Sequence, residues 1–232
     1  MGIYKRSFTI FGVIILACAA SFAIRGLSQS IDFTGGRNYK IEVLSEVEPE
    51  QITAALQVKF NEASAKDETV EDATVKTIAL GTDKKAVRVT TNYRIAENSS
   101  DVDAEIETIL YETFKEMGVI DPNLSREAFV NPDERDGGSI ISSQKVGPSI
   151  AKDITYGAII SVILAFVAIF LYILLRFRNV AYSVGSTVAL VIDTMLIIGA
   201  YSLCYGWIGF SLEIDQTFIG AILTAIGYSI ND

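Results

Sequence analysis

The sequence predicts an α+β membrane protein, in which transmembrane α-helices carry one external ferredoxin-like (βαββαβ) domain. Two observations lead to this class. Apolar residues make up 50% of the 232 positions and the mean hydropathy is +0.37, yet 20% of the residues are charged. The apolar and charged residues are segregated, because residues 25–153 hold 15 of the 19 basic and 24 of the 28 acidic residues. A membrane protein with one large aqueous domain accounts for this segregation.

The composition also excludes several functions. The net charge of −9 belongs to residues 25–153, so no basic patch is available to bind a nucleic acid. The chain has no histidine, and its two cysteines, Cys18 and Cys204, lie in apolar segments. A thiolate zinc site and a disulfide framework are therefore not expected, a Cys-His or Ser-His-Asp hydrolase is excluded, and neither a metal nor another cofactor is expected.

Four apolar stretches predict membrane-spanning helices: residues 8–24, 154–175, 180–203 and a fourth that begins near residue 217. The second stretch has 22 uncharged residues. As a helix it would be about 33 Å long, which is enough to cross a hydrocarbon core of about 30 Å. Within the third stretch, Asp193 is the one charged residue.

The charges of the connecting segments predict the orientation of these spans. Basic residues without acidic neighbours precede the first span and occupy the 176–179 turn, whereas the segment after the third span carries acidic charges alone. By the positive-inside rule, the N-terminus and this turn are cytoplasmic and residues about 25–153 are periplasmic. A cleavable signal peptide is the alternative for the first stretch. Its apolar character continues past Cys18 to Ile24, which favours a retained anchor.

Alternating and helical spacings predict the elements of the external domain. We expect strands at residues 38–44, 73–80, 85–91 and 138–146, and helices over residues 48–60 and from Asp101 to about Gly118. The order strand, helix, strand, strand, helix, strand is that of the ferredoxin-like split βαβ unit. The acidic residues of this domain predict a solvated surface, with a negatively charged docking face as the alternative.

The predicted elements divide the chain into three parts. These are residues 1–30 (first transmembrane helix and its exit), 31–147 (periplasmic ferredoxin-like domain) and 148–232 (second and third transmembrane helices and part of a fourth).

Two motifs stand at the junctions of these parts: IDFTGG at residues 31–36 and QKVGPSIAKD at residues 144–153. A third, AILTAIGYSIND at residues 221–232, lies in the fourth span. In this order around one external domain, they resemble the SecF family of protein-export membrane proteins, which includes the SecF halves of SecDF fusions. The resemblance covers essentially the whole chain, and GYSIND is its most specific part. The family is related to the resistance-nodulation-division transporters and has six spans, so we expect the chain to be truncated in the fourth.

The resemblance implies an accessory subunit of the Sec machinery in the bacterial inner membrane, and not an enzyme. Such a subunit uses proton flow to assist the late translocation of polypeptides on the periplasmic side. Its implied partners are SecD (separate or fused), the SecYEG translocon, a YajC-type accessory subunit and the translocating polypeptide, together with membrane lipid. Two alternatives stay open: a fragment of a proton-driven exporter of small molecules or lipids of the resistance-nodulation-division type, and a membrane-anchored interaction module without ion coupling.

Two carboxyl groups fall within the predicted spans, where an ionised carboxylate is costly and a functional role is the default expectation. The resemblance marks Asp232, the last residue of GYSIND, as the proton-handling carboxylate; the alternative is a helix-end residue at the membrane interface. Asp193 shares a small-residue face with Gly185 and Ala189, and a similar face begins at Gly157. We interpret Asp193 either as a second relay carboxyl or as a buried acceptor for hydroxyls of neighbouring helices. Both interpretations keep it inside the helix bundle.

Other residues of GYSIND have supporting roles. Asn231 is a candidate hydrogen-bond partner of Asp232, and the alternatives are that it positions the motif or bonds a neighbouring helix. Gly227, Tyr228 and Ser229 complete the motif, and the glycine and the serine offer small surfaces for close helix packing.

The IDFTGG motif predicts a turn after the first span. Gly35 and Gly36 permit a backbone turn that side chains would obstruct. Asp32 lies outside the predicted hydrocarbon region, and we expect it to cap this turn.

Overall fold

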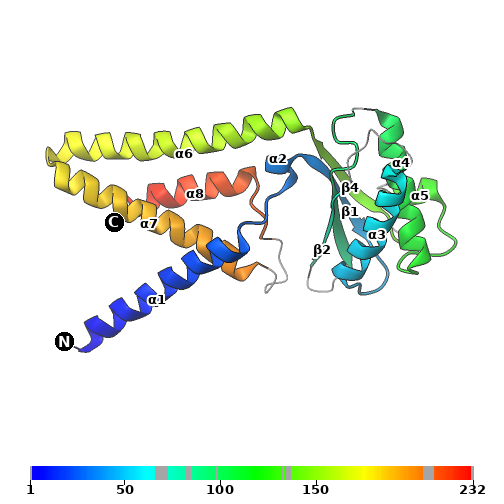
Figure 1. Ribbon diagram of the computed structural model, residues 1–232, viewed down its shortest axis with the longest axis horizontal. Helices are drawn as coiled ribbons and strands as arrows, with labels where there is room; N and C mark the ends of the chain where they lie inside the picture. Colours follow the sequence, from blue (N-terminus) through cyan, green and yellow to red (C-terminus); the bar gives the residue numbers. More distant parts are fainter. Residues whose placement is uncertain are drawn as a thin grey trace. The chain divides into compact units, whose positions relative to one another are not determined.

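The computed structural model describes residues 2–65, 73–81, 85–97, 99–131, 133, 137–205 and 212–230. The chain divides into two compact units (Figure 1). The sheet unit consists of the described part of Thr34–Lys152. The helical unit consists of the described parts of Met1–Phe33, Asp153–Ile208 and Leu212–Asp232. The expected combination of apolar helices with a small sheet is confirmed.

Among its described residues, the sheet unit has four strands and three helices. In chain order these are β1 (Gly36–Glu42), α3 (Pro49–Ser64), β2 (Val75–Leu80), β3 (Ala86–Thr91), α4 (Ser100–Glu116), α5 (Arg126–Val130) and β4 (Ile140–Val146). The strands lie in the order β2-β3-β1-β4, and every neighbouring pair is antiparallel. Figure 1 shows α3 and α4 on the same side of the sheet.

The hydrophobic core of the sheet unit lies between the sheet and these helices. In β1 the alternate residues Tyr39 and Ile41 are buried, because successive side chains of a strand point to opposite faces. In α3 and α4, apolar residues three or four positions apart are fully excluded from solvent: Ile52, Leu56, Phe60, Ile106, Leu110 and Phe114. Burial of each such side chain stabilises the fold by about 1.5–3 kcal/mol.

The bounds of several elements of the sheet unit differ from the sequence prediction by two to four residues, and one short helix was not predicted. Strand β1 begins two residues early, because Gly36 and Arg37 form ladder pairs with β4. The five-residue helix α5 has no predicted counterpart, since five residues are too few to show a helical period. It is held in place by Ser125, whose Oγ accepts a hydrogen bond from the amide of Ala128, and by the fully buried Phe129.

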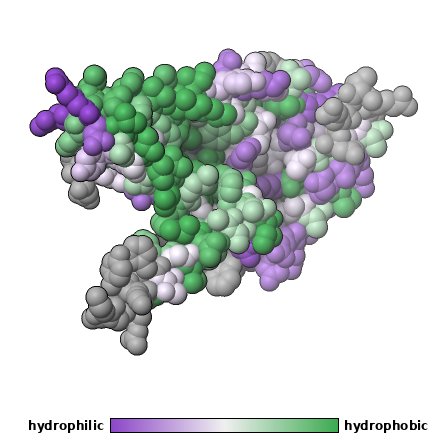
Figure 2. Space-filling view, turned by 60° about the vertical axis from the view of Figure 1, so that its left-hand side comes forward, coloured by the Kyte–Doolittle hydropathy of each residue, from purple (hydrophilic) through white to green (hydrophobic). Residues whose placement is uncertain are grey.

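The remaining helices are α1 (Gly2–Arg25), α2 (Ile31–Thr34), α6 (Pro148–Phe177), α7 (Val180–Cys204) and α8 (Gln216–Ser229). Of these, α6 and α7 are long and apolar enough to cross a membrane, and Thr9–Arg25 of α1 is a shorter apolar helix. Figure 2 shows apolar residues over much of the surface of these helices.

Helix α1 packs against α7 at Gly199. A Cβ atom at this position would collide with the Cβ atom of the buried Cys18, so the two backbones approach as closely as only glycine permits. The hydroxyls of Ser21 and Ser202 lie 3.2 Å apart across the same contact, and Ser202 Oγ also donates to the carbonyl of Gly26 at 2.9 Å. Small residues and interhelical hydrogen bonds therefore join these two helices.

The small-residue faces that the sequence points to lie elsewhere. Gly157 of α6 and Gly185 and Ala189 of α7 are exposed, and Cβ atoms at the two glycines would meet nothing within 4 Å among the described residues. A four-residue spacing identifies one face of a helix but does not identify its partner. The face of α7 that packs on α1 is the one that carries Gly199.

Helix α8 packs against α7 through an apolar stripe. Phe218, Ile222 and Ile226 are buried and cluster with Leu190 of α7. The ring centroids of Tyr201 and Phe218 lie 4.4 Å apart. The packing of the stripe on Leu190 places the other end of α8, which carries GYS, beside the middle of α7.

Candidate functional site

The candidate site is a hydrogen bond between two helices of the helical unit. Ser229 Oγ, in the last turn of α8, donates to Asp193 Oδ2 of α7 at 2.5 Å. The apolar contacts between Leu190 and the α8 stripe place the two residues beside each other. The structure thus brings together one residue of GYSIND and the single acidic residue of the third apolar stretch.

The other predicted residues of this site are placed as follows. Gly227 and Tyr228 are exposed, the tyrosine by 73%. Asn231 and Asp232 lie outside the described residues. Asp193 is itself exposed within the described part of the chain, in contrast to the buried position that the sequence predicts. The reason is that α7 packs on α1 through the face that carries Gly199, and Asp193 lies on another face. Among the described residues, its carboxylate is bonded to Ser229.

Two carboxylates cap the opposite end of α8. Asp215 Oδ1 accepts hydrogen bonds from the amide of Phe218 at 2.8 Å and from Thr217 Oγ1 at 2.6 Å. Asp32 Oδ2, from α2, accepts from the amide of Gln216 at 3.1 Å. Acidic groups are favourable here, because the first amides of a helix are unpaired and its N-terminus carries a partial positive charge. Asp32 therefore caps α8.

Backbone hydrogen bonds tie the same segment to the start of α8. The amide of Ser30 donates to the carbonyl of Ile214 at 2.9 Å, and the amide of Ile214 donates to the carbonyl of Ser28 at 2.8 Å. Gln29 and Ile214 form an isolated parallel bridge. We call this contact between residues 28–32 and 214–216 the exit joint.

Of the two glycines of IDFTGG, Gly35 lies between α2 and β1 and Gly36 is the first residue of β1. Gly35 has φ of +74° and Gly36 has φ of +149°, a backbone conformation that L side chains rarely adopt. A Cβ atom at Gly35 would also lie 3.5 Å from the Cα atom of Pro148. Glycine is thus needed at this turn for its conformation.

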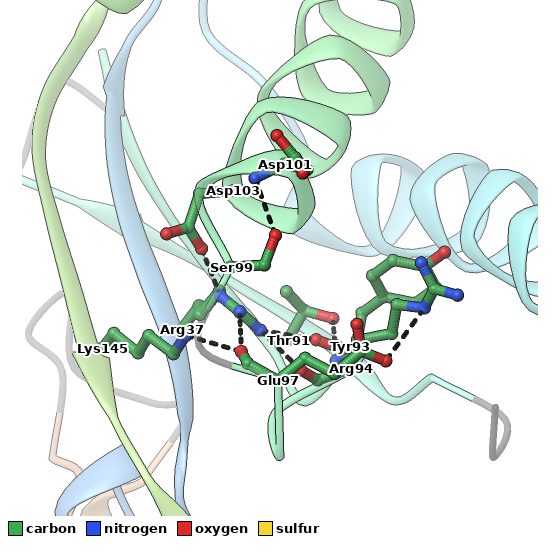
Figure 3. Close-up of polar contacts among 9 residues, drawn as sticks. All are labelled: Arg37, Thr91, Tyr93, Arg94, Glu97, Ser99, Asp101, Asp103 and Lys145. Atoms are coloured by element: carbon green, nitrogen blue, oxygen red, sulfur yellow. Dashed lines mark hydrogen bonds and ion pairs between the residues drawn. The ribbon is translucent and has the colours of Figure 1, made fainter.

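Sequence reasoning missed the residue that follows these glycines. The side chain of Arg37 is 1% exposed, and all three of its guanidinium nitrogens donate hydrogen bonds (Figure 3). Nε donates to Asp103 Oδ1 at 2.6 Å, Nη1 to the carbonyl of Tyr93 at 2.7 Å and Nη2 to the carbonyl of Glu97 at 3.0 Å. A buried charge is tolerated when it is paired and hydrogen-bonded in this way.

Lys145 reinforces the same turn. It is the ladder partner of Arg37 on β4, and its Nζ atom donates to the carbonyl of Glu97 at 2.8 Å (Figure 3). Two cations from neighbouring strands therefore hold residues 93–97, directly before α4. A basic residue in an otherwise alternating strand is the sequence signal that could have pointed to this cluster.

Acidic groups of α4 alter the titration of the residues around Arg37. Burial raises the pKa of Tyr39 above its ordinary range, and the charges of Asp103 and Glu107 raise it further. Burial also raises the pKa of Glu107; Asp103 adds to this increase, while Arg126 opposes it. The ionised form of Glu107 is therefore disfavoured in the folded sheet unit.

The described residues include no group of three or more histidine, cysteine or acidic side chains arranged to hold a metal ion. The chemistry that the Asp193–Ser229 pair can perform is proton exchange at a carboxyl group. Gain or loss of a proton there changes a hydrogen bond that joins two helices.

Two family models match parts of this chain. Residues 129–232 match the family described as protein export membrane protein SecD/SecF, C-terminal. Residues 20–43 match the SecD/SecF GG motif, which takes in Asp32, the two glycines and Arg37.

Relatives of known name align with almost the whole chain. The protein translocase subunit SecF of Rhodothermus marinus is 34% identical over 98% of this chain, and that of Thermobaculum terrenum is 27% identical over 99%. The chain spans 63% and 65% of the lengths of these two proteins.

The crystal structure of SecDF, a translocon-associated membrane protein from Thermus thermophilus, has a similar fold. It matches all of this chain with a TM-score of 0.64 and 23% identity, and the matched part is 26% of that structure. The family matches and the relatives agree with the resemblance inferred from the three motifs. The chain therefore belongs to the SecD/SecF family of protein-export membrane proteins and is of the SecF type.

Proposed function

We propose that this protein acts as a SecF-type subunit of the Sec protein-export machinery. It uses proton flow across the inner membrane to assist the late translocation of polypeptides on the periplasmic side. The observation that supports this proposal best is the bonding of α8. One end of this helix is hydrogen-bonded to the carboxylate of Asp193, and the other end to Asp32 in the segment that leads into β1.

The proposed coupling runs along α8. Protonation of Asp193 removes its negative charge and weakens the hydrogen bond that it accepts from Ser229, because bonds to charged acceptors are the stronger ones. The 14 residues of α8 span about 21 Å, so a shift of its end would be carried to the exit joint as a rigid movement. The exit joint continues through Gly35 and Gly36 into β1. Proton exchange and the external domain are linked through this path.

Asp232 is the principal proton carrier in this proposal. It follows Ser229 by three residues in GYSIND, and the family resemblance assigns proton handling to this position. Asn231 supports it as a hydrogen-bond partner, and Asp193 serves as the second carboxyl of the relay.

The architecture that goes with this function has four spans, of which the fourth is α8. The N-terminus is cytoplasmic and residues about 25–153 are periplasmic. The domain of residues 31–147 is of the ferredoxin-like type, which the chain order of its strands and helices and the sheet order β2-β3-β1-β4 support. The partners are SecD, the SecYEG translocon, a YajC-type accessory subunit and the translocating polypeptide.

Export of a secreted reporter into inverted membrane vesicles tests the proposal. Vesicles that contain the full-length protein should export faster when a proton gradient is applied, and the Asp232→Asn variant should lose this acceleration. Asp133→Asn, which changes an exposed acid of the sheet unit, is the matched control and should keep it. Gradient-dependent export that survives in Asp232→Asn would contradict the proposal and favour an interaction module without ion coupling.

A further inference from the structure

A cavity of about 760 Å³ opens between α6, α7 and α8. Its volume lies in the range of about 300–1,000 Å³ that is typical of sites for small molecules. Much of its lining is apolar and includes Ile173, Leu190 and Ile230. An apolar cavity of this kind offers water few hydrogen bonds and suits a hydrocarbon occupant.

The part of the cavity beside the α6–α7 turn has a different character. Its lining includes Arg176, Phe177 and Tyr182. The Arg176 guanidinium lies 5.8 Å from the centroid of the Phe177 ring. Arg176 forms no ion pair with any described residue, and none of the lining residues is acidic. Figure 2 shows hydrophilic residues gathered at the end of the helices, next to apolar surface.

This combination is that of a site for an amphiphile with a negatively charged head. Both α6 and α7 are long and apolar enough to span a membrane, so the hydrocarbon available to the cavity is that of lipid chains. Tyrosine and arginine are the residues found at the level of lipid head groups, and basic pockets between transmembrane helices bind anionic head groups. A purely apolar protein helix would fill the apolar walls but would leave the charge of Arg176 without a counterion.

We propose that this cavity binds an anionic phospholipid, with an acyl chain against Ile173 and Leu190 and the phosphate at Arg176. The inference requires that α6 and α7 cross a membrane, and it does not depend on proton coupling. Ser229, the partner of Asp193, also lines the cavity. The bound acyl chain therefore lies against the hydrogen bond between α7 and α8.

Photo-crosslinking tests the proposal in the full-length protein reconstituted into vesicles. Benzoylphenylalanine replaces Tyr182 at the cavity, or Tyr156 of α6 as the matched control, since both tyrosines are 67% exposed and only Tyr182 lines the cavity. With phosphatidylglycerol present, Tyr182→benzoylphenylalanine should form lipid adducts at a roughly fivefold higher yield than the control position. Vesicles of phosphatidylcholine alone should remove this excess.

Two arginine variants separate a built site from general attraction to the basic turn. Arg176→Gln should abolish the excess of adducts, whereas Arg178→Gln removes the same charge from a residue outside the cavity and should leave the excess in place. Equal yields at the two positions, equal loss in both arginine variants, or a crosslink from position 182 to protein instead of lipid would each overturn the proposal.

Discussion

Asp193 of α7 is hydrogen-bonded to Ser229 of α8, and this bond joins two helices that otherwise meet through apolar side chains. A carboxylate within an apolar helix of a membrane protein is a functional candidate by default. Here its described partner belongs to GYSIND, the most specific motif of the sequence. The presence or loss of this bond therefore changes how firmly α8 is attached to α7.

Loss of the hydroxyl of Ser229 or of the carboxylate of Asp193 should slow gradient-dependent export. Ser229→Ala should slow gradient-dependent export, because an interhelical hydrogen bond in a membrane contributes about 0.6 kcal/mol on average and up to about 1.7, or roughly three- to twentyfold in rate. Asp193→Asn should lose at least as much, and the double variant should lose no more than Asp193→Asn alone. Thr224→Val is the control, since the Thr224 hydroxyl donates to Gly220 within α8. Additive losses in the double variant would show that the two residues act separately.

Arg37 should be the side chain whose loss most weakens the turn before α4. Arg37→Ala removes the ion pair with the half-exposed Asp103 and leaves the buried carbonyl of Tyr93 without its charged donor. An unsatisfied buried polar group costs about 1–3 kcal/mol. Hydrogen exchange of residues 93–110 in the intact protein should accelerate accordingly. Arg126→Ala breaks a more exposed pair, with Glu107 at 4.0 Å, and should cost about 0–1 kcal/mol. Exchange as slow in Arg37→Ala as in Arg126→Ala would contradict a role for Arg37 in holding the turn.

The same substitution should weaken the contact between α1 and α7 at Gly199 but not at Gly185. Gly199→Val places a side chain against Cys18 of α1, and overpacking of this kind costs about 1–3 kcal/mol. Gly185→Val meets no described atom and should leave the contact between α1 and α7 unchanged. Thermal unfolding in detergent compares the two variants. Equal stability would show that α1 and α7 do not pack as closely as described.

The raised pKa of Glu107 predicts how the stability of the sheet unit depends on pH. At pH values above 4.5, the ordinary pKa of this carboxyl group, the folded state binds the proton more readily than the unfolded state does. The free energy of unfolding therefore rises as the pH falls from neutral through the folded pKa towards 4.5. Glu107→Gln should stabilise the unit at neutral pH and reduce this gain on acidification.

Hydrogen exchange at pH 7 and at pH 5 tests this effect. Glu112→Gln changes an exposed acid of the same helix and should alter the pH dependence less. A larger gain on acidification in Glu107→Gln than in the unmodified protein would contradict the assignment.

Long or regular patterns made much of the fold predictable from the sequence. The long apolar runs of residues 154–175 and 180–203, the second with the single charge of Asp193, correspond to α6 and α7, because a helix in hydrocarbon needs little besides apolar side chains and length. The alternating stretches of the sheet unit correspond to β1–β4, within two residues at each start. Helix α5 was not predictable, since its position depends on the burial of Phe129 in a core that the whole unit builds.

The contacts of the site were less predictable than its residues. The sequence points to Asp193, Ser229 and Asp32 separately, but a linear pattern does not state which side chains meet. That Asp32 caps α8 rather than its own turn follows from the exit joint, which joins positions about 184 residues apart. Arg37 was missed because a charged residue in a strand is ordinarily solvated. Its burial depends on four carbonyl and carboxylate partners that the fold supplies, from Asp103, Tyr93, Arg94 and Glu97.

Simultaneous measurement of proton flow and export in the same inverted vesicles tests the proposed function most directly. A pH-sensitive dye reports protons that cross the membrane, while protease protection reports the reporter protein that has been exported. In vesicles with the full-length protein, Asp232→Asn should abolish the proton flow and the gradient-dependent part of export together, and Asp133→Asn should abolish neither. Export that still accelerates with the gradient while proton flow through the Asp232→Asn protein is lost would contradict the proposal that this flow drives export.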